Sequence, residues 1–303
     1  ERPQNHHPPT FAPKMEDLLP RFRGIESRLT DSQVKGIHRG FGYQNDVLGA
    51  LHSQSGQDGT VIKILNMTGG YFVDLAANEP IYLSNTRALE RDYGWNGVCV
   101  DGNDQMLERL VQHRRCRVIK GAVTAQVGGK VTFLTPVWDV KAVQAAREGK
   151  PLARNAMSGI LSNSTDLKSD RGWVRAEMPS TTLMEILQHV RAPRVVNYLS
   201  LDIEGAEYEA LRTFDFSRYR FDVMTIERPN AALRALLRAN SYGYALDHGC
   251  FGDQLWVHSS ISERAARALG VQALPDRRHD FHGRPTGCHG SKGPPTGIAR
   301  FEK

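Results

Sequence analysis

YFVDLA, at residues 71–76, is a short apolar run with an acid near its end, and this stretch decides the fold class. Pro80 suits the first turn of the helix that follows and Gly94 suits its end, so the segment predicts a strand, a turn and a helix. GVCVDGN, at residues 97–103, repeats the arrangement, with Asn103 placed to cap the next helix. Repetition of this unit is typical of a parallel sheet covered by helices.

The rest of the core continues the alternation of strands and helices. The helix after Asn103 is expected to carry Met106, Leu107, Leu110 and Val111 on one face. We predict an α/β fold, with a doubly wound, mostly parallel Rossmann-like sheet and helices on both faces. Further strands are expected at RVIKGAV (117–123), VVNYLSLDIEG (195–205) and FDVMTIERPN (221–230), then an antiparallel pair at YALDHG (244–249) and DQLWVHSS (253–260); helices are expected after the capping-box pair Thr182 and Glu185 and after Pro229.

Length and composition indicate one globular catalytic domain with added ends, in a chain of 303 residues. We divide it into an N-terminal extension (1–47), a core domain (48–260) with an insertion at about 138–179, and a basic, Gly- and Pro-rich tail (261–303). The net charge of +6 leaves an acidic partner open, but it is interpreted first as a solvated basic surface, because arginines are spread along the chain. No apolar run approaches the roughly 20 residues of a membrane helix.

The four cysteines show no C-x-x-C spacing, which disfavours a zinc site built from them. Cys99 is expected to be a buried strand residue. Cys250 and Cys288 are expected to tie the tail to the core if the compartment is oxidising. The sequence thus leaves the redox environment open.

Two N-x-[ST] acceptor sequences occur, at Asn66 with Thr68 and at Asn163 with Thr165, and either would be used only in a secretory compartment. The chain begins at Glu1, so a signal peptide or membrane anchor would lie upstream of it. The compartment therefore stays open between the secretory pathway, with the Golgi lumen as one case, and the cytoplasm.

Acids at the ends of predicted strands indicate where a cofactor binds, because ligands of open α/β sheets lie outside the carboxyl ends of the strands. Asp74 and the turn after it would present backbone N–H groups to an anionic group. Asp101 is placed to accept hydrogen bonds from ribose hydroxyls, and the stretch 121–123 would border an adenine. The alternative is that both acids only cap the helices after them. Residues 74–80 contain no glycine, which disfavours a nicotinamide cofactor.

Several segments resemble one family in its order of motifs. They are SQSGQD (53–58), FVDLAAN (72–78), SNTRALERDYGWNGVCVDGN (84–103) and LSLDIEGAEYEAL (199–211). Together with FDVMTIERPN and DQLWV they resemble the FkbM-type methyltransferases, which methylate hydroxyl groups of sugars and of some polyketides with S-adenosylmethionine, over about two-thirds of the chain. With the strand-end argument, the resemblance implies cofactor-binding roles for Gln57, Asp74, Ala76, Asn78, Ser84, Asn85, Asp101, Gly102, Asn103, Gly121, Ala122 and Asp202.

The turn after the first strand departs from the family pattern. Ala76 stands where the family normally carries glycine, and Pro80 replaces a small residue. If the backbone at Ala76 needs a positive φ, alanine costs about 1 kcal/mol or more; if φ is negative, the change is nearly harmless. A non-catalytic binding protein on a decayed methyltransferase domain is therefore kept as an alternative.

Methyl transfer to a hydroxyl needs a base or a metal ion to take up or acidify the proton. Asp202, Glu204 and Glu227 are expected to converge at two strand ends, an arrangement similar to metal-dependent small-molecule O-methyltransferases, and their oxygen ligands suit Mg²⁺. The alternative is that Glu204 and Glu207 pair with arginines or cap a helix. Asp202 and Glu227 are also catalytic candidates, and His248 is the best candidate for a general base unless it is an exposed loop residue.

The resemblance implies a carbohydrate hydroxyl as the methyl acceptor. A small-molecule or polyketide hydroxyl comes second. Nucleic acid is disfavoured as a partner, because the sequence has no evident stacking platform of aromatic and basic residues.

Overall fold

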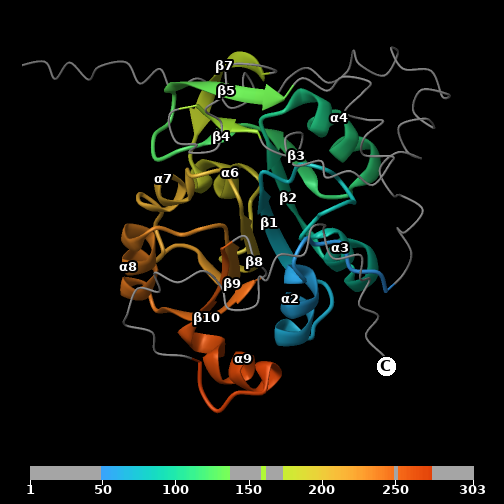
Figure 1. The fold of residues 1–303 in the computed structure, drawn as a ribbon, viewed down its shortest axis with the longest axis vertical. Helices are drawn as coiled ribbons and strands as arrows, with labels where there is room; N and C mark the ends of the chain where they lie inside the picture. Colours follow the sequence, from blue (N-terminus) through green and yellow to red (C-terminus); the bar gives the residue numbers. More distant parts are fainter. Residues whose placement is uncertain (1–48, 137–157, 162–172, 249–251, 275–303) are drawn as a thin grey trace, which may run out of the picture.

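The computed structural model describes residues 49–136, 158–161, 173–248 and 252–274 (Figure 1). Within them, seven strands form one sheet in the order β10-β11-β9-β8-β1-β2-β3. Neighbouring strands from β9 to β3 are parallel, and β11 runs antiparallel to both β9 and β10. The strands are β1 (Tyr71–Leu75), β2 (Asn96–Asp101), β3 (Arg117–Lys120), β8 (Val195–Leu201), β9 (Arg220–Ile226), β10 (Tyr242–His248) and β11 (Asp253–His258).

Alternate residues of the central strands enter two separate hydrophobic clusters. Phe72 of β1 packs in one cluster and Val73 in the other, because successive side chains of a strand point to opposite faces. Cys99 and Val98 of β2 divide in the same way. The fold is therefore mixed α/β, with a large, mostly parallel sheet packed by helices. The Phe72 cluster includes α2 (Gln57–Leu65), α3 (Arg87–Tyr93), α4 (Asp104–His113) and α9 (Ser262–Leu269), and the Val73 cluster includes α6 (Leu183–His189), α7 (Glu207–Leu211) and α8 (Ala231–Ala239).

Three predicted helix starts are confirmed by their caps, each of which contributes about 1 kcal/mol. The Asn103 side chain accepts the N–H of Gln105 at the start of α4. Thr182 and Glu185 form a full capping box on α6. Asn230, just after Pro229, caps α8.

Two expectations about helices are wrong. The helix after β1, α3, starts at Arg87 rather than in the turn at Pro80, although Gly94 does end it in a left-handed conformation. The Glu79 carboxylate accepts the N–H groups of Ile81 and Tyr82, which folds this stretch into a tight loop instead. Val111 is 53% exposed, so only Met106, Leu107 and Leu110 bury the inner face of α4.

The predicted strand at residues 117–123 is split at Gly121. Its first part is β3 of the main sheet, and its second part, β4 (Ala122–Val123), joins a smaller sheet. That sheet has the order β4-β7-β5-β6 and lies beyond the carboxyl end of β3, at the top of Figure 1. The other strands are β5 (Lys130–Pro136), β6 (Gly159–Ile160) and β7 (Trp173–Thr181), so part of the expected insertion is β-structure and the rest lies outside the described residues.

Cys99 is a buried strand residue, as predicted, and it forms a disulfide with Cys116. Cys250 and Cys288 lie outside the described residues, as does the N-terminal extension. After β11 the chain continues as η4 (Ser259–Ile261) and α9, which packs against α2. Among the residues described, no helix has both the length and the apolarity required to cross a bilayer.

Candidate active site

A cleft of about 630 Å³, open to solvent, runs along the carboxyl ends of β1, β2 and β8. Among the residues predicted to bind a cofactor, those that line it are Ala76, Asn78, Asp101, Gly102, Gly121, Ala122 and Asp202. The other lining residues are Val100, Val123, Phe133, Ser158, Gly159, Ile160, Ile203 and Glu204.

The Asp101 carboxylate is held at one end of this cleft by backbone donors. It accepts the N–H of Asn78 at 2.8 Å on one oxygen and the N–H of Asn103 at 2.7 Å on the other. Burial raises the pKa of Asp101 to about 6, against the effect of these hydrogen bonds. An ionised carboxylate offers about four acceptor positions, so Asp101 keeps acceptor capacity beyond these backbone N–H groups.

An apolar wall of the cleft packs against Gly102, the residue after Asp101. A Cβ atom on Gly102 would lie 2.5 Å from the ring of Phe133, so only glycine allows this close packing. Phe133 and Ile160 come from the smaller sheet, and they pack in one cluster with Ala122. This wall fits a flat heterocycle. Sequence reasoning missed Phe133 and Ile160, because nothing in the local pattern of β5 or β6 points to the DGN turn.

Asp74 does not line the cleft. It is buried and accepts the hydroxyl of Thr86 at 2.6 Å. Arg114 donates to Thr86, to Ser84 and to the carbonyl of Pro80. Burial raises the pKa of Asp74, and the Arg114 charge opposes this. Asp74 and Ser84 therefore fix the loop that follows β1.

Arg114 is paired with Glu90, and both side chains are fully buried. The Glu90 carboxylate also accepts the backbone N–H groups of Arg115 and Cys116. Sequence reasoning missed this pair, because HRRC at residues 113–116 reads as an ordinary basic helix end.

Three other predicted cofactor residues do not line the cleft. Gln57 donates from Nε2 to Asp253 at 2.7 Å. Asn85 donates from Nδ2 to Ser200 Oγ at 3.0 Å. Asn103 caps α4, and the roles of all three in cofactor binding stay predictions.

Non-glycine residues adopt positive φ angles at this edge of the sheet. Ala76 has φ 58° and Asn78 has φ 50°, directly after β1. Glu204 has φ 57° after β8, and Arg228 has φ 41° after β9. Each such conformation costs about 1–2 kcal/mol, and strain of this kind clusters at functional sites. Ala76 thus adopts the less favourable of the two conformations considered for it.

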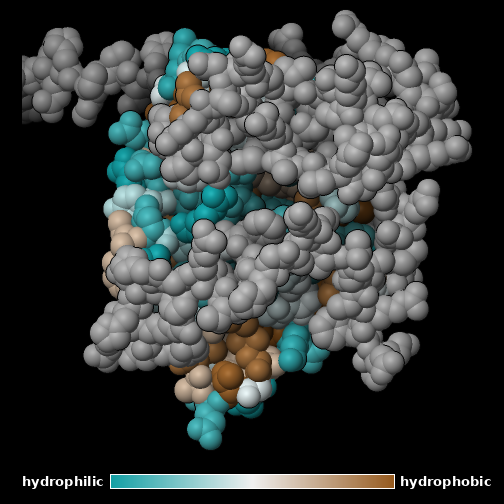
Figure 2. Space-filling view, in the orientation of Figure 1, coloured by the Kyte–Doolittle hydropathy of each residue, from teal (hydrophilic) through white to brown (hydrophobic). Residues whose placement is uncertain are grey.

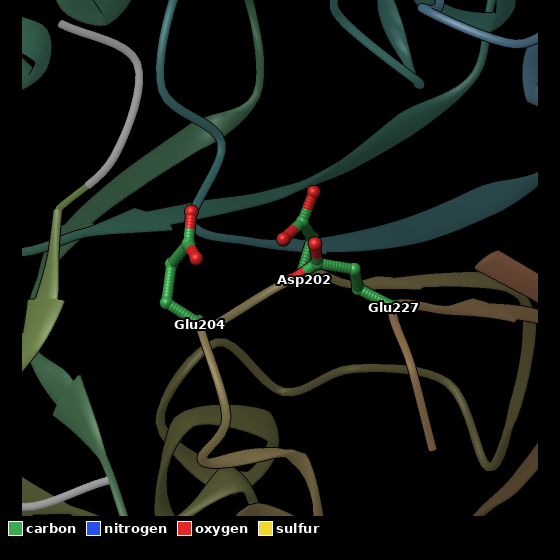
Figure 3. A group of neighbouring side chains, drawn as sticks. All are labelled: Asp202, Glu204 and Glu227. Carbon is green, nitrogen blue, oxygen red and sulfur yellow. The ribbon is translucent and has the colours of Figure 1, made fainter. Parts of the chain in front are cut away.

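Asp202, Glu204 and Glu227 converge, with one carboxylate oxygen from each lying within 4.8 Å of the others (Figure 3). Asp202 follows β8 and Glu227 follows β9, and the N–H of Glu227 donates to the carbonyl of Leu201. Burial raises the pKa of Asp202 well above its usual range, and the neighbouring Glu227 charge raises it further. Arg228 pairs with Glu227 and lies 4.0 Å from Glu204. The predicted convergence is therefore present, together with the arginine pairing considered as its alternative.

Glu207 serves a structural role. Its carboxylate accepts the N–H groups of Ile203 and Gly205, which closes the turn after β8. This turn places Glu204 against the cleft while Glu207 stays buried behind it.

His248 is the last residue of β10 and is buried, rather than an exposed loop residue. It hydrogen-bonds to the backbone of Ser55, and burial lowers its pKa. Its Nε2 has no partner in the described part of the chain. His248 does not line the cleft, so its catalytic role stays a prediction.

Asp253 stands opposite His248 in the β10–β11 register. Gln254 pairs with Ile226 of β9, so Asp253 lies beside Glu227. Burial raises the pKa of Asp253 to about 7, with the Glu227 charge as the next cause. Sequence reasoning missed Asp253, although it opens the DQLWV motif.

Comparison with known proteins gives one family. The family model of the methyltransferase FkbM domain matches residues 74–246, which is more than half of the chain. The match contains Asp101 and the Asp202–Glu227 edge. A search of curated proteins finds no match. The chain belongs to the FkbM methyltransferase domain family.

Proposed function

We propose that this methyltransferase uses S-adenosylmethionine to methylate a hydroxyl group, and that its sheet is a doubly wound, Rossmann-like methyltransferase sheet. One observation carries the proposal: Asp101 and the Asp202–Glu204 acids line the same cleft. A nucleoside held at Asp101 would extend toward the acids, so the reacting end of the cofactor and the proton acceptor would meet.

The residues present fit the cofactor at three points. The Asp101 carboxylate would accept the two ribose hydroxyls. Phe133, Ile160 and Ala122 would border the adenine. The backbone at Ala76 and Asn78 would face the methionine part, because both residues line the cleft after β1.

The cofactor supplies a methyl group on a positively charged sulfur. The protein must hold the acceptor oxygen in line with that methyl group and remove the hydroxyl proton. Asp202 lines this end of the cleft and has the Glu227 carboxylate beside it, and one of these two acids would take the proton. His248 does not line the cleft, so it is a weaker candidate for the base than these acids.

The same acids would hold a divalent cation. Asp202, Glu204 and Glu227 offer only oxygen ligands, which suits Mg²⁺ or Ca²⁺. Bound there, an ion would lower the pKa of the acceptor hydroxyl and displace Arg228 from Glu227. Methyl transfer measured after removal of divalent cations with a chelator, and again after addition of Mg²⁺, tests this. Full activity in the presence of the chelator would show that the carboxylates act as bases without a bound cation.

A carbohydrate hydroxyl is our first choice of acceptor, and a small-molecule or polyketide hydroxyl is the second. The exposed residues over the middle of the molecule, near α7, are hydrophilic in Figure 2, whereas apolar surface gathers near α9. Since α7 follows Glu204, a polar acceptor would reach the acids over polar surface. Carboxylates also accept hydrogen bonds from neighbouring hydroxyls of a sugar.

Radiolabelled S-adenosylmethionine tests the proposal against panels of glycans and small-molecule alcohols. We expect label on a glycan hydroxyl. Cofactor binding with no transfer to any glycan would contradict the acceptor assignment. Calorimetry distinguishes an active methyltransferase from a non-catalytic protein on a decayed methyltransferase domain. The decayed domain would have lost its cofactor site and would show no saturable heat of binding with S-adenosylmethionine.

A further inference from the structure

The acceptor sequence at Asn66 occupies an exposed turn between α2 and β1 (Figure 1). Asn66 and Thr68 are both exposed, with the half-buried Met67 between them. An oligosaccharide can be attached only where the asparagine side chain is reachable and the surface has room for it. This turn meets both requirements.

The disulfide between Cys99 and Cys116 is a second, independent observation. It links β2 to the residue before β3, with Cα atoms 5.9 Å apart, and both cysteines are buried. No free cysteine occurs in the described ranges. Disulfides persist in oxidising compartments and are rare where thiols are kept reduced.

From these two observations we propose that the chain folds in a secretory compartment and carries an N-linked glycan on Asn66. The Nδ2 nitrogen of Asn66 loses a proton and bonds to the anomeric carbon of an oligosaccharide, whose bond to a lipid diphosphate carrier breaks. The Cys99 and Cys116 thiols give up their protons and an electron pair to a thiol–disulfide oxidoreductase of the same compartment. The proposal does not depend on the methyl acceptor.

A glycan at Asn66 leaves the cleft open. The turn precedes Tyr71, the first residue of β1, whereas the cleft begins at Ala76, beyond the last. Five residues of strand separate the two edges by about 17 Å. The oligosaccharide would therefore extend from the edge of the sheet opposite the site.

Helix geometry explains Asn66 but not Thr68. Asn66 ends α2 with φ 36°, a left-handed conformation that favours asparagine or glycine. Thr68 lies two residues later and is exposed. Substitution of Thr68 therefore separates glycosylation from helix capping.

The decisive experiment is a peptide map of the full-length protein purified from the cells that make it. Enzymatic deglycosylation in ¹⁸O-water should convert Asn66 to a labelled aspartate, and the unreduced digest should contain Cys99 and Cys116 in one linked peptide. An unmodified Asn66 peptide as the main form would overturn the proposal, as would free Cys99 and Cys116 thiols.

Variants secreted from a eukaryotic host provide the matched control, in a chain whose second acceptor sequence is removed by Asn163→Gln. Thr68→Ala should abolish the remaining glycan, and Thr68→Ser should keep it. Both should bind S-adenosylmethionine as the parent does, because neither touches the cleft. A glycan that survives Thr68→Ala would place the modification elsewhere and refute the assignment to Asn66.

Discussion

The two ends of the cleft differ in how their charged side chains are paired. At the proposed cofactor end, the buried charges are satisfied: Asp101 accepts two backbone N–H groups, and Arg114 is paired with Glu90. At the proposed acceptor end, like charges are crowded together, and Asp253 has a buried oxygen without a partner in the described part of the chain. The hydrogen bonds and ion pair at the proposed cofactor end fix its geometry.

In the proposed reaction, the acceptor end would exchange a proton or bind a cation. Glu204 and Arg228 adopt strained backbone conformations there, and the pKa of Asp202 is raised because desolvation and the neighbouring Glu227 charge disfavour its ionised form. Strain and like-charge crowding lower stability and persist where they serve a reaction. Substitutions at the cofactor end should therefore reduce stability or cofactor affinity, whereas substitutions at the acceptor end should reduce turnover.

The largest effect is expected from Glu227→Gln. It removes a carboxylate that accepts a proton or holds a cation, so kcat should fall by about 10²- to 10⁴-fold. The Kd for S-adenosylmethionine should stay nearly unchanged, since Glu227 does not line the cleft. Kinetics with calorimetry check both values, with Glu209→Gln, at a half-exposed residue outside the cleft, as control. A loss of cofactor affinity as large as the loss of kcat would show that the two ends of the cleft do not have separate roles.

Arg114→Met should have the next largest effect, and on stability. It leaves Glu90 as an unpaired buried charge, which costs about 3–5 kcal/mol in free energy of unfolding. Urea unfolding measures this loss. Arg212→Met, in a half-exposed pair with Glu209, should cost under about 1 kcal/mol. Similar values for both variants would show that the Arg114 pair does not hold the cofactor end together.

Asp101→Ala should weaken cofactor binding without unfolding the protein. Hydrogen bonds to a charged group contribute about 1.5–3 kcal/mol, so the Kd should rise by roughly 10- to 150-fold. Calorimetry with S-adenosylmethionine is the measurement. Retention of full affinity would refute the ribose assignment.

Acid pH should weaken cofactor binding through the same carboxylate. The pKa of Asp101 is raised to about 6, so the ionised form that accepts both hydroxyls dominates above this pH. Below it, the Kd should rise about tenfold per pH unit. The stability of the free protein has the opposite sign: because the folded pKa is raised, the Asp101 contribution becomes more favourable as pH falls from about 6 toward the unfolded value. Asp101→Asn should remove most of the pH dependence of the Kd for S-adenosylmethionine. An unchanged pH dependence would show that another group is responsible for it.

Much of the scaffold was predictable from the sequence because its signals are local. Strand alternation, the Asn103 cap and the Thr182–Glu185 capping box depend on neighbours within one turn or strand. The same reasoning placed Asp101 and Asp202 at strand ends, and both line the cleft. The Val111 expectation failed because periodicity alone does not define the width of a buried helix face.

The residues that complete the site come from long-range contacts, which leave no local pattern. Phe133 reaches Gly102 from another sheet, and Asp253 reaches Glu227 through strand pairing. Arg114 joins Asp74 to Glu90 through a loop that sequence reasoning took for the start of a helix. The residue type also does not predict a backbone angle: the positive φ of Ala76 could not be inferred from the sequence.

Ala76→Gly should have the smallest effect, and a favourable one. Because φ at Ala76 is 58°, removing the methyl group should relieve about 1 kcal/mol of strain and raise the free energy of unfolding. Ala77→Gly is the matched control; Ala77 is buried and its φ is not positive, so the same change there should destabilise by about 1 kcal/mol. Denaturant unfolding of both variants gives the two signs. A gain for Ala76→Gly with unchanged cofactor affinity would mean that alanine in this turn lowers stability but leaves the cofactor end competent, whereas a loss equal to that of Ala77→Gly would show that the turn is not strained.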